Sequence, residues 1–305
     1  MRAESASIAR RADMLTEETA YDAATRFIGS IGEYPASRFR GRGVVICGGG
    51  RQYFPCAWVC INMLRHVGVK LPIELWGLNA GELDEEMREL VKPLGVRCVD
   101  GSRVRKKHPV RILDGWELKP YSIIHSRFRE VLFLDADNVA VRDPTDLFEW
   151  EEYRKYGAIF WPAYGPYRPT DPIWRICRIP YYEESDFETG QIVIDKSRCW
   201  KALQLTMHFN ENSDFYYYYT QGDKDTFHFA WKMVGQGYTM VPTPVVKVEG
   251  AAWQHDLNGQ RIFQHRYEWK WSIEEANPLI PDFLLEKECF DYLLRLPHGW
   301  LRRGE

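Results

Sequence analysis

Apolar residues follow two different spacings along this chain. Short apolar runs, typical of buried strands, alternate with stretches in which apolar residues recur every three or four positions, typical of helices. The first half contains predicted strands at 44–47, 73–78, 96–99 and 131–134, with helices at 54–64 and 82–94 and a further segment at 119–126. This alternation predicts an α/β fold of the Rossmann-like type, a mostly parallel sheet with helices on both faces.

The second half of the chain is less regular. Its predicted strands are 156–161, 191–195, 238–241, 245–248 and 262–265, and its predicted helices are 196–209 and 223–234. At the two ends we predict a helix that begins after the N-cap Thr16 and a tail helix at 283–294 that docks on the body. Neither repeats nor a convincing linker interrupt the pattern. We therefore expect a single central domain at 43–268, with a helical extension at 1–42 and a helical tail at 269–305.

Composition and charge exclude several classes of protein. The 305 residues are 45% hydrophobic and 27% charged, as in soluble globular proteins. A net charge of −3 gives no basic field for nucleic acid, and no apolar run approaches the ~18 residues of a membrane span. Seven cysteines with neither zinc-ligand spacing nor a signal peptide predict reduced thiols in a cytoplasmic protein.

Aromatic residues are abundant, at 14% with 12 Trp. Their flat faces stack on sugars as well as filling cores. We expect most of them in the core, including those in the clusters 216–219 and 269–271.

Two carboxylates follow the most apolar strand, in Phe133-Leu134-Asp135-Ala136-Asp137-Asn138. Ligands of such sheets sit beyond the carboxyl ends of the strands. Asp135 and Asp137, two residues apart, can together face one Mg²⁺ or Mn²⁺, which in turn would hold a diphosphate. The alternative is a turn that merely favours Asp and Asn.

Two weaker signals would support a nucleotide site near these carboxylates. Glycines at the first strand–helix junction let the backbone approach a ligand closely, although a tight turn explains them as well: Gly48, Gly49 and Gly50. Arg51 just beyond could meet a phosphate or be solvated. Lys119, sixteen residues before Asp135, could reach a donor phosphate or a sugar hydroxyl.

Two polar segments in the second half carry further candidates. A Gly-containing turn before the strand at 191–195 could expose Glu188, Thr189 and Gln191 to a ligand, or be an ordinary loop. The helix at 223–234 opens with Asp223 and Asp225. One of them would be its N-cap, and the other could bind an acceptor hydroxyl or orient a donor sugar.

A late histidine could complete a metal site. His265 ends a strand-like run and could add an imidazole ligand to the two carboxylates, with His255 as its competitor.

These features occur together in a known family. The segments concerned are Gly41-Arg42-Gly43-Val44-Val45-Ile46 with the glycines after it, Lys119, Glu130-Val131-Leu132-Phe133-Leu134-Asp135-Ala136-Asp137-Asn138, Glu188-Thr189-Gly190-Gln191, Asp195-Lys196-Ser197-Arg198, Gly222-Asp223-Lys224-Asp225-Thr226-Phe227 and His265-Arg266. Their combination, over residues 40–268, resembles the nucleotide-sugar glycosyltransferases of the GT-A fold. It is most similar to the fungal α-mannosyltransferases of glycosyltransferase family 71, distantly akin to the glycogenin-like family.

The resemblance implies a retaining transfer of mannose or another hexose with Mn²⁺ or Mg²⁺ as cofactor. The donor would be GDP-mannose or a UDP-hexose, and the acceptor a glycan, a protein or a small molecule. By the resemblance, Asp135 faces the ribose and the metal, while Asp137 and His265 ligate the metal. The residues that would line the donor sugar and the acceptor are Glu188, Gln191, Asp223 and Asp225. The donor-binding set comprises Gly48, Gly49, Gly50, Arg51, Lys119, Asp135 and Asn138. Unlike the fungal enzymes, this sequence shows no membrane anchor or luminal stem, which favours a cytoplasmic member.

Two other classes of function are compatible with parts of the pattern. A haloacid-dehalogenase-like phosphatase also has an apolar strand that ends in two spaced aspartates, but near the start of its catalytic core. Here, two or three strand–helix units precede them. A sugar-binding module without turnover would use the aromatic residues, yet it rarely needs the aspartates, the glycine loop and the histidine together.

Overall fold

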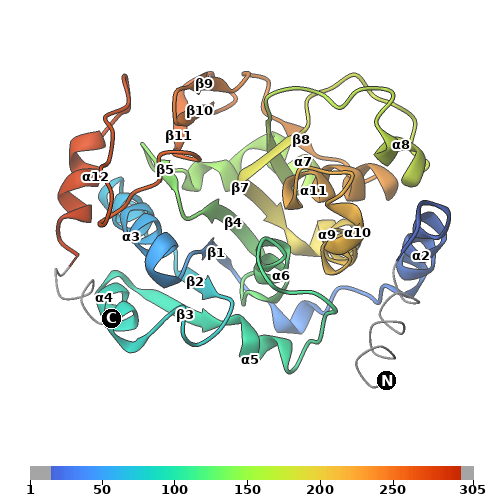
Figure 1. The fold of residues 1–305 in the computed structure, drawn as a ribbon, viewed down its shortest axis with the longest axis horizontal. Helices are drawn as coiled ribbons and strands as arrows, with labels where there is room; N and C mark the ends of the chain where they lie inside the picture. The colour runs from blue at the N-terminus through green and yellow to red at the C-terminus, as the bar shows by residue number, and fades with distance from the viewer. Residues whose placement is uncertain (1–14, 297–305) are drawn as a thin grey trace, which may run out of the picture.

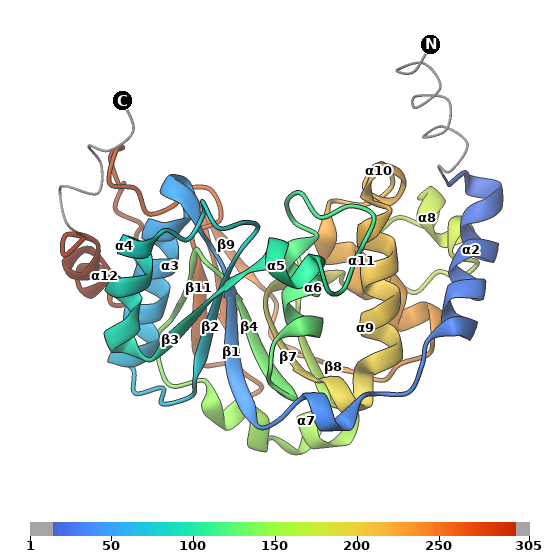
Figure 2. The same ribbon diagram turned by 90° about the horizontal axis from the view of Figure 1, so that it is seen from below.

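A seven-stranded sheet forms the centre of the computed structural model, which describes residues 15–296 (Figures 1 and 2). The strand order is β3-β2-β1-β4-β7-β6-β8. In chain order these strands are β1 (Arg42–Cys47), β2 (Ile73–Gly77), β3 (Val96–Asp100), β4 (Glu130–Asp135), β6 (Ala158–Pro162), β7 (Phe187–Asp195) and β8 (Thr239–Met240). Parallel pairing joins β3, β2, β1 and β4, and β6 with β8, whereas β7 runs antiparallel to both of its neighbours. The predicted mostly parallel sheet is therefore confirmed.

Successive residues of the strands point to opposite faces of the sheet and build two separate cores. Val44 and Ile46 of β1 face one core, and Val45 faces the other. On the first face lie α3 (Gly50–His66), α4 (Glu85–Val91) and α12 (Glu286–Leu293). On the second face lie α5 (Gly101–Arg105), α6 (Leu118–His125), α9 (Lys196–Glu211), α10 (Ser213–Tyr216) and α11 (Asp223–Met233), with α2 (Glu17–Ser30) and α8 (Pro172–Ile176) outside them.

A second, four-stranded sheet has the order β5-β11-β10-β9. Its strands are β5 (Asn138–Ala140), β9 (Val246–Val248), β10 (Ala251–His255) and β11 (Arg261–His265). The sequence pattern missed β5 and β10. Because β5 follows β4 directly, the segment around Asp137 links the two sheets, and the pairing of Asn138 with His265 brings the late histidine beside it.

Both ends of the described chain carry the helices that we predicted. Thr16 caps α2 through a capping box with Thr19, as expected for this N-cap. At the other end, α12 packs against α3, and Trp58 donates a hydrogen bond to the carbonyl oxygen of Tyr292 (2.7 Å). The outer parts of the predicted extensions, 1–14 and 297–305, lie outside the described residues.

Several predicted boundaries were wrong. The helix expected at 82–94 begins at Glu85, because the Asp84 side chain caps it, and ends in a 3₁₀ turn at 92–94. The strand expected from Tyr156 begins at Ala158, because 151–156 forms the short helix α7, which ends at Gly157 in the left-handed region. The expected turn at 187–191 is the first half of β7.

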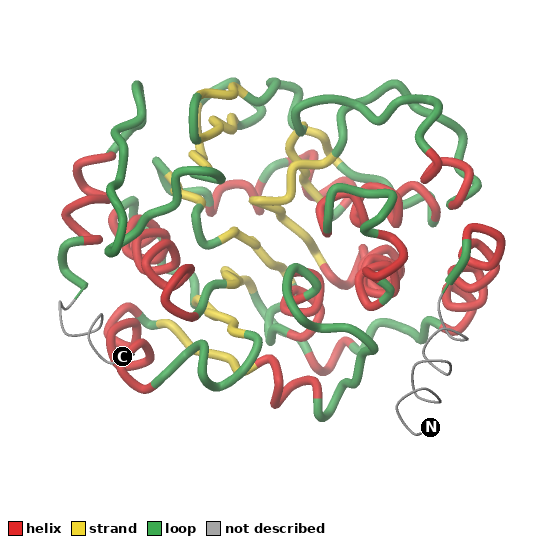
Figure 3. The backbone as a smooth tube through the Cα atoms, in the orientation of Figure 1, coloured by secondary structure: helices red, strands yellow, loops and turns green. Residues whose placement is uncertain are grey.

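The described chain also contains short helical elements outside the layers named above. Besides α7, the chain forms 3₁₀ turns at 36–38 and 145–149 (Figure 3). Among the described residues, each helix is too short or too polar to cross a membrane. All seven cysteines are free thiols, as predicted, and five of them are buried.

Candidate active site

A cleft lies beyond the carboxyl ends of β1, β2 and β4, where the fold class predicts a ligand. Its volume is about 520 Å³. It is lined by Cys47, Gly48, Gly49, Tyr53, Trp76, Leu78, Glu82, Gly115, Trp116, Leu118, Lys119, Asp135, Ala136, Asp137, Asp223, His265, Tyr267 and Lys270.

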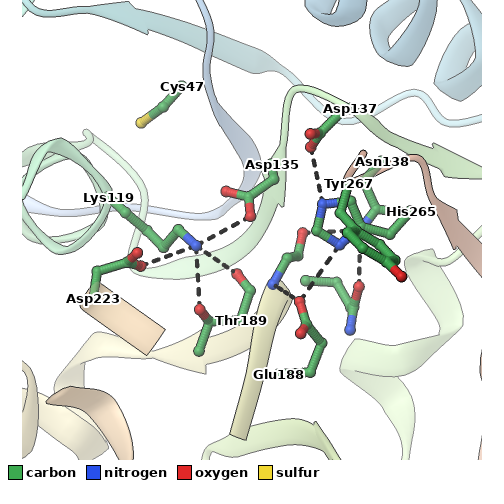
Figure 4. Close-up of polar contacts among 12 residues, drawn as sticks. Cys47, Lys119, Asp135, Asp137, Asn138, Glu188, Thr189, Asp223, His265 and Tyr267 are labelled. Carbon is green, nitrogen blue, oxygen red and sulfur yellow. Dashed lines mark hydrogen bonds and ion pairs between the residues drawn. The ribbon is translucent and has the colours of Figure 1, made fainter. Parts of the chain in front are cut away.

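Asp135, Asp137 and His265 converge in this cleft. One ligand atom from each lies within 4.8 Å of the other two, and Nε2 of His265 is 3.0 Å from Oδ1 of Asp137 (Figure 4). The structure thus brings together the three residues that the sequence suggested for the metal. The competitor His255 stands at the end of β10 and is outside this group.

The buried charges of these residues change each other's pKa. Burial would lower the pKa of His265, but Asp137 and Glu188 on its two ring nitrogens raise it to about 10. Burial would raise the pKa of Asp137, yet His265 and Lys270 hold it well below its usual range. Burial raises the pKa of Asp135 to about 6 despite the attraction of Lys119. Asp137 therefore stays ionised over the whole neutral range, whereas Asp135 takes up a proton more readily than an ordinary carboxylate.

Lys119 is buried at the centre of the cleft. Its Nζ lies 3.1 Å from Oδ2 of Asp135 and 3.0 Å from Oδ2 of Asp223, and it donates hydrogen bonds to the carbonyl oxygen and the hydroxyl of Thr189, each 3.1 Å long (Figure 4). These carboxylates raise the pKa of Lys119 although burial opposes them, so this lysine stays charged. The ammonium group of Lys119 thus holds together the end of β4, the first half of β7 and the start of α11.

Glu188 lies behind His265. Its Oε1 accepts a hydrogen bond from the backbone N–H of Gly190 (2.8 Å) and is 3.5 Å from Nδ1 of His265. A side chain at position 190 would not fit, since its Cβ would lie 2.6 Å from that same Nδ1. Glu188 therefore holds the ring nitrogen of His265 that faces away from Asp137.

Other predicted site residues lie outside the cleft. Gln191 and Asn138 are fully buried, and the Asn138 amide donates to Oε1 of Gln191 (2.8 Å). Asp225 is also fully buried and accepts bonds from Tyr167 and from the backbone of Gln221. The direct catalytic roles suggested for Gln191 and Asp225 stay predictions that this placement does not favour.

The glycine loop and the start of α11 differ in detail from what we expected. Gly48 and Gly49 line the cleft, whereas Gly50 and Arg51 begin α3 and are not part of its lining. Neither Asp223 nor Asp225 is the N-cap of α11, because that position is taken by Gly222, with φ +78°. Asp223 is instead free to face Lys119 in the cleft.

Sequence reasoning missed Lys270 and Trp116. The ammonium group of Lys270 contacts Oδ2 of Asp137, and the aromatic ring of Trp116 stands exposed at the rim. A lysine five residues after His265 was a usable signal for a second cation near the carboxylates. Trp116 carries no signal of its own in the sequence.

The residues present fit a divalent cation. Carboxylate oxygens suit Mg²⁺ and Mn²⁺, and an imidazole nitrogen shifts the preference from Mg²⁺ towards a transition-metal ion. Glu188 supplies the outer partner that metal-bound histidines commonly have. Asp135, Asp137 and His265 would hold the ion.

The fold, with this cleft beyond the strand ends, is the GT-A fold found in glycosyltransferases. Residues 41–176 and 180–265 match the model of the Mannosyl_trans3 family, a mannosyltransferase family. The chain therefore belongs to this mannosyltransferase family. Membership does not favour the phosphatase alternative.

Curated relatives and a solved structure agree with this assignment. The chain is 27% identical to Alpha-1,2-mannosyltransferase MNN23 of Candida albicans, over 82% of this chain and 49% of that protein. It is 26% identical to Alpha-1,2-mannosyltransferase MNN5 of Saccharomyces cerevisiae, over 80% and 54%. The chain thus spans about half the length of these relatives. The apo glycosyltransferase GlyE of Streptococcus pneumoniae has the same fold, with a TM-score of 0.52 and 14% identity, over 84% of this chain and 61% of that one.

Proposed function

We propose that this protein transfers mannose from a nucleotide diphosphate to an acceptor hydroxyl, with retention of configuration and with Mn²⁺ as cofactor. The observation that carries the proposal is the convergence of Asp135, Asp137 and His265 in a cleft beyond the strand ends. Mannose as the transferred sugar follows from the names of the relatives.

In the proposed reaction, the acceptor oxygen bonds to the anomeric carbon while the bond from that carbon to the diphosphate oxygen breaks. The electron pair of the broken bond stays on the diphosphate, and the hydroxyl proton passes to the same phosphate oxygen. The cation, when bound, would offset the charge of the leaving diphosphate, which is the largest electrostatic demand of the step. Retention is proposed because the relatives are named α-1,2-mannosyltransferases and GDP-mannose is an α-linked donor.

This chain's own residues can supply further positive charge to the leaving group. Lys270 contacts Oδ2 of Asp137, the oxygen that His265 does not contact. Lys119 contacts Oδ2 of Asp135 and Oδ2 of Asp223. We assign Lys270 to the diphosphate, and Lys119 with Asp223 to the transferred sugar.

The donor base would lie in the part of the cleft between β1 and β2. Gly48 and Gly49 give a backbone surface there, and Tyr53, Trp76 and Leu78 give an apolar one. GDP-mannose is the donor we propose, and UDP-hexoses are its competitors in the test.

A thermal-shift panel tests the donor and the cofactor together. GDP, UDP, GDP-mannose, UDP-glucose and UDP-galactose are each added with and without Mn²⁺, because a ligand that binds the native state raises its Tm. We expect GDP and GDP-mannose to raise Tm only when Mn²⁺ is present. Stabilisation by UDP compounds alone would overturn the donor, and no response to any nucleotide at saturating concentration would overturn the function.

Asp137→Asn tests the site itself. Removing this charge should abolish transfer and the Mn²⁺-dependent shift while the protein stays folded, as measured by circular dichroism. Asp146→Asn, on the 3₁₀ turn at 145–149 and outside the cleft, is the matched control and should behave as the wild type. Full activity of the Asp137 variant would contradict the proposal.

A further inference from the structure

Exposed cations gather on one part of the surface outside the cleft. They come from the segments 38–40 and 97–107 and from the residue three positions before β4, and we call them the basic patch: Arg38, Arg40, Arg97, Arg103, Lys106, Lys107 and Arg127. None of these side chains lines the cleft. The one acid within the two segments, Asp100, is buried at the N-cap of α5, where it pairs with Arg103. The patch is therefore strongly positive, although the whole chain has a net charge of −3.

A buried carboxylate holds two of these cations in place. Oε1 of Glu74 lies 3.0 Å from Nη1 of Arg97 and 3.6 Å from Nε of Arg127. Glu74 is 1% exposed, and its second oxygen accepts a hydrogen bond from the indole N–H of Trp76 (3.1 Å). The two arginine side chains remain 57% and 49% exposed. One fixed negative charge thus orders two positive charges that still face the solvent.

Contacts at the end of α6 join the parts of the patch. Nη2 of Arg38 donates a hydrogen bond to Nδ1 of His125 (2.8 Å). Burial, with Arg38 nearby, lowers the pKa of His125 to about 2, so this acceptor carries no charge at neutral pH. His108, directly after the segment 97–107, stacks on the ring of His125 with centroids 4.6 Å apart. The backbone N–H of Arg40 donates to the carbonyl oxygen of Arg127 (3.0 Å), which brings these two cations side by side.

The patch begins at the end of the main sheet that is opposite to the cleft. Arg40 and Arg127 precede β1 and β4, so they stand at the amino ends of these parallel strands (Figure 2). The cleft lies beyond the carboxyl ends of the same strands. A partner bound at this end therefore leaves the cleft free for its own ligands.

The aromatic rings beside the patch are covered. Phe39 and Phe128 lie beneath the guanidinium groups of Arg38 and Arg127, and the two rings are only 3% and 2% exposed. Proteins that bind single-stranded nucleic acid combine positive charge with exposed rings on which bases stack. Anionic lipid headgroups, by contrast, are attracted by a dense group of Lys and Arg alone. The composition of the patch matches the lipid surface.

We propose that the basic patch attaches this protein peripherally to a membrane surface rich in anionic phospholipids. Its seven cations face the headgroups, with the amino ends of β1 and β4 towards the membrane and the cleft open to the solvent. This attachment is independent of the proposed sugar transfer, because none of the seven residues takes part in that reaction.

Sedimentation with lipid vesicles tests the proposal. The full chain is mixed with vesicles of phosphatidylcholine alone or of equal parts of phosphatidylcholine and phosphatidylserine, and we expect it to bind only the mixed vesicles. Added salt should release it, because exposed charges are screened. Each Lys or Arg near such a surface strengthens binding about fivefold, so Lys106→Gln combined with Lys107→Gln should weaken binding about 25-fold.

Two further double variants make the test specific. Lys106→Arg with Lys107→Arg keeps both charges and should bind as the wild type does. Lys247→Gln with Lys287→Gln removes the same charge from exposed positions on β9 and α12, outside the patch, and should also bind as the wild type does. Circular dichroism should show the same folded spectrum for all of these proteins.

Several results would overturn the membrane assignment. They are equal binding to both kinds of vesicle, binding to neither, wild-type affinity in the Gln variant of Lys106 and Lys107, and an equal loss of affinity in the Lys247 and Lys287 variant. Binding of duplex DNA or single-stranded RNA without binding of vesicles would assign the patch to nucleic acid instead. The proposed function would stand in each case, since the nucleotide panel tests it separately.

Discussion

At the scale of single residues, His265 is shared between two carboxylates with different tasks. Nε2 faces Asp137, whereas Nδ1 faces Glu188, which is itself fixed by the backbone of Gly190. A carboxylate on the far nitrogen of a metal-binding histidine sets its tautomer and its orientation. Glu188 is therefore a positioning residue for the proposed metal site.

Replacing Glu188 tests this role. Glu188→Gln keeps the size of the side chain but removes its charge, and we expect Mn²⁺ affinity to fall by about 10- to 100-fold. The free ion can be followed by its paramagnetic resonance signal during titration. Glu89→Gln, on an exposed turn of α4, is the control. Unchanged Mn²⁺ affinity in the Glu188 variant would show that it does not orient His265.

Binding of Mn²⁺ should depend on pH through His265. Its pKa is raised to about 10, so at neutral pH the free protein carries a proton there that a metal must displace. Apparent Mn²⁺ affinity should therefore increase as pH rises towards 10. Calorimetry in two buffers of different ionisation enthalpy should detect about one released proton at pH 7.5. Binding without proton release would contradict the raised pKa.

The raised pKa of His265 also makes the stability of the metal-free protein depend on pH, in the opposite direction. Because this pKa is higher in the folded protein than in the unfolded chain, where it is about 6.5, protonation of His265 stabilises the fold, and this stabilisation is complete below pH 6.5. The stabilisation is lost as the pH rises through 10. Urea midpoints of the metal-free protein should accordingly fall between pH 7 and 10, and less steeply in His265→Gln. Equal slopes in the two proteins would contradict this linkage.

The candidate site was predictable where charged side chains stand directly at the end of a buried strand. Asp135 and Asp137 are two charges at the end of an apolar strand, which is costly unless a ligand uses them. Lys119 became a candidate only because these two aspartates were already candidates. Gln191 and Asp225 carry the same polar chemistry, but their contacts are made by distant partners, Asn138 and Tyr167, which no local pattern reveals.

At the scale of elements, β7 explains why part of the site was hard to predict. Because β7 runs antiparallel to β4, its beginning lies beside the end of β4, as the pairing of Gln191 with Leu134 shows. The rule that ligands sit at carboxyl ends holds for the parallel strands only. Glu188 and Thr189 therefore reach the cleft from the beginning of a strand, where the sequence pattern indicated a loop.

The start of α11 depends on a buried carboxylate. Asp225 accepts hydrogen bonds from the Tyr167 hydroxyl (2.5 Å) and from the backbone N–H of Gln221 (2.7 Å), and it contacts Lys224. These bonds hold the segment that carries Gly222 and Asp223 in the cleft. Asp225 thus contributes to the site through the position of its helix.

Two variants separate this structural role from catalysis. Tyr167→Phe leaves the buried carboxylate short of one partner and should lower the free energy of unfolding by about 1–3 kcal/mol, as measured by urea denaturation. Asp225→Asn should destabilise the protein as well. If Asp225 acted directly in the reaction, Asp225→Asn would abolish transfer at unchanged stability, which would contradict the assignment made here.

At the scale of the whole molecule, the two sheets are joined through the segment that carries the site. The chain passes from β4 through Asp137 into β5, which pairs with β11 and thereby with the C-terminal part. Arg266, fully buried, donates to the carbonyl oxygens of Trp269 (2.6 Å) and Pro278 (3.1 Å) and pairs with Glu286 (3.0 Å). The segment predicted as a tail is thus anchored beside His265, the proposed metal ligand.

The alternation of strands and helices predicted the main sheet because its central strands β1 and β4 each contain a run of at least three apolar residues. It did not predict the second sheet in full, since β5 has only three residues and follows the aspartates without a break. The sequence pattern also did not indicate how many side chains each terminal segment buries. In the structure, the two terminal segments differ in the number and size of these buried side chains.

The two ends should therefore respond differently to removal. The C-terminal segment adds Trp271, Ile280, Phe283, Cys289 and Leu293 to the first core. At about 1.5–3 kcal/mol for each large apolar side chain, their loss is comparable to the whole stability of a typical domain. Helix α2, by contrast, buries only the two small side chains Ala20 and Ala24 completely.

We expect a chain without 269–305 to be insoluble or unfolded by circular dichroism, and a chain without 1–31 to fold cooperatively with a lower Tm. A cooperative unfolding transition in the C-terminal truncation would show that 269–305 is an appendage, and loss of the fold in the N-terminal one would show that α2 belongs to the core.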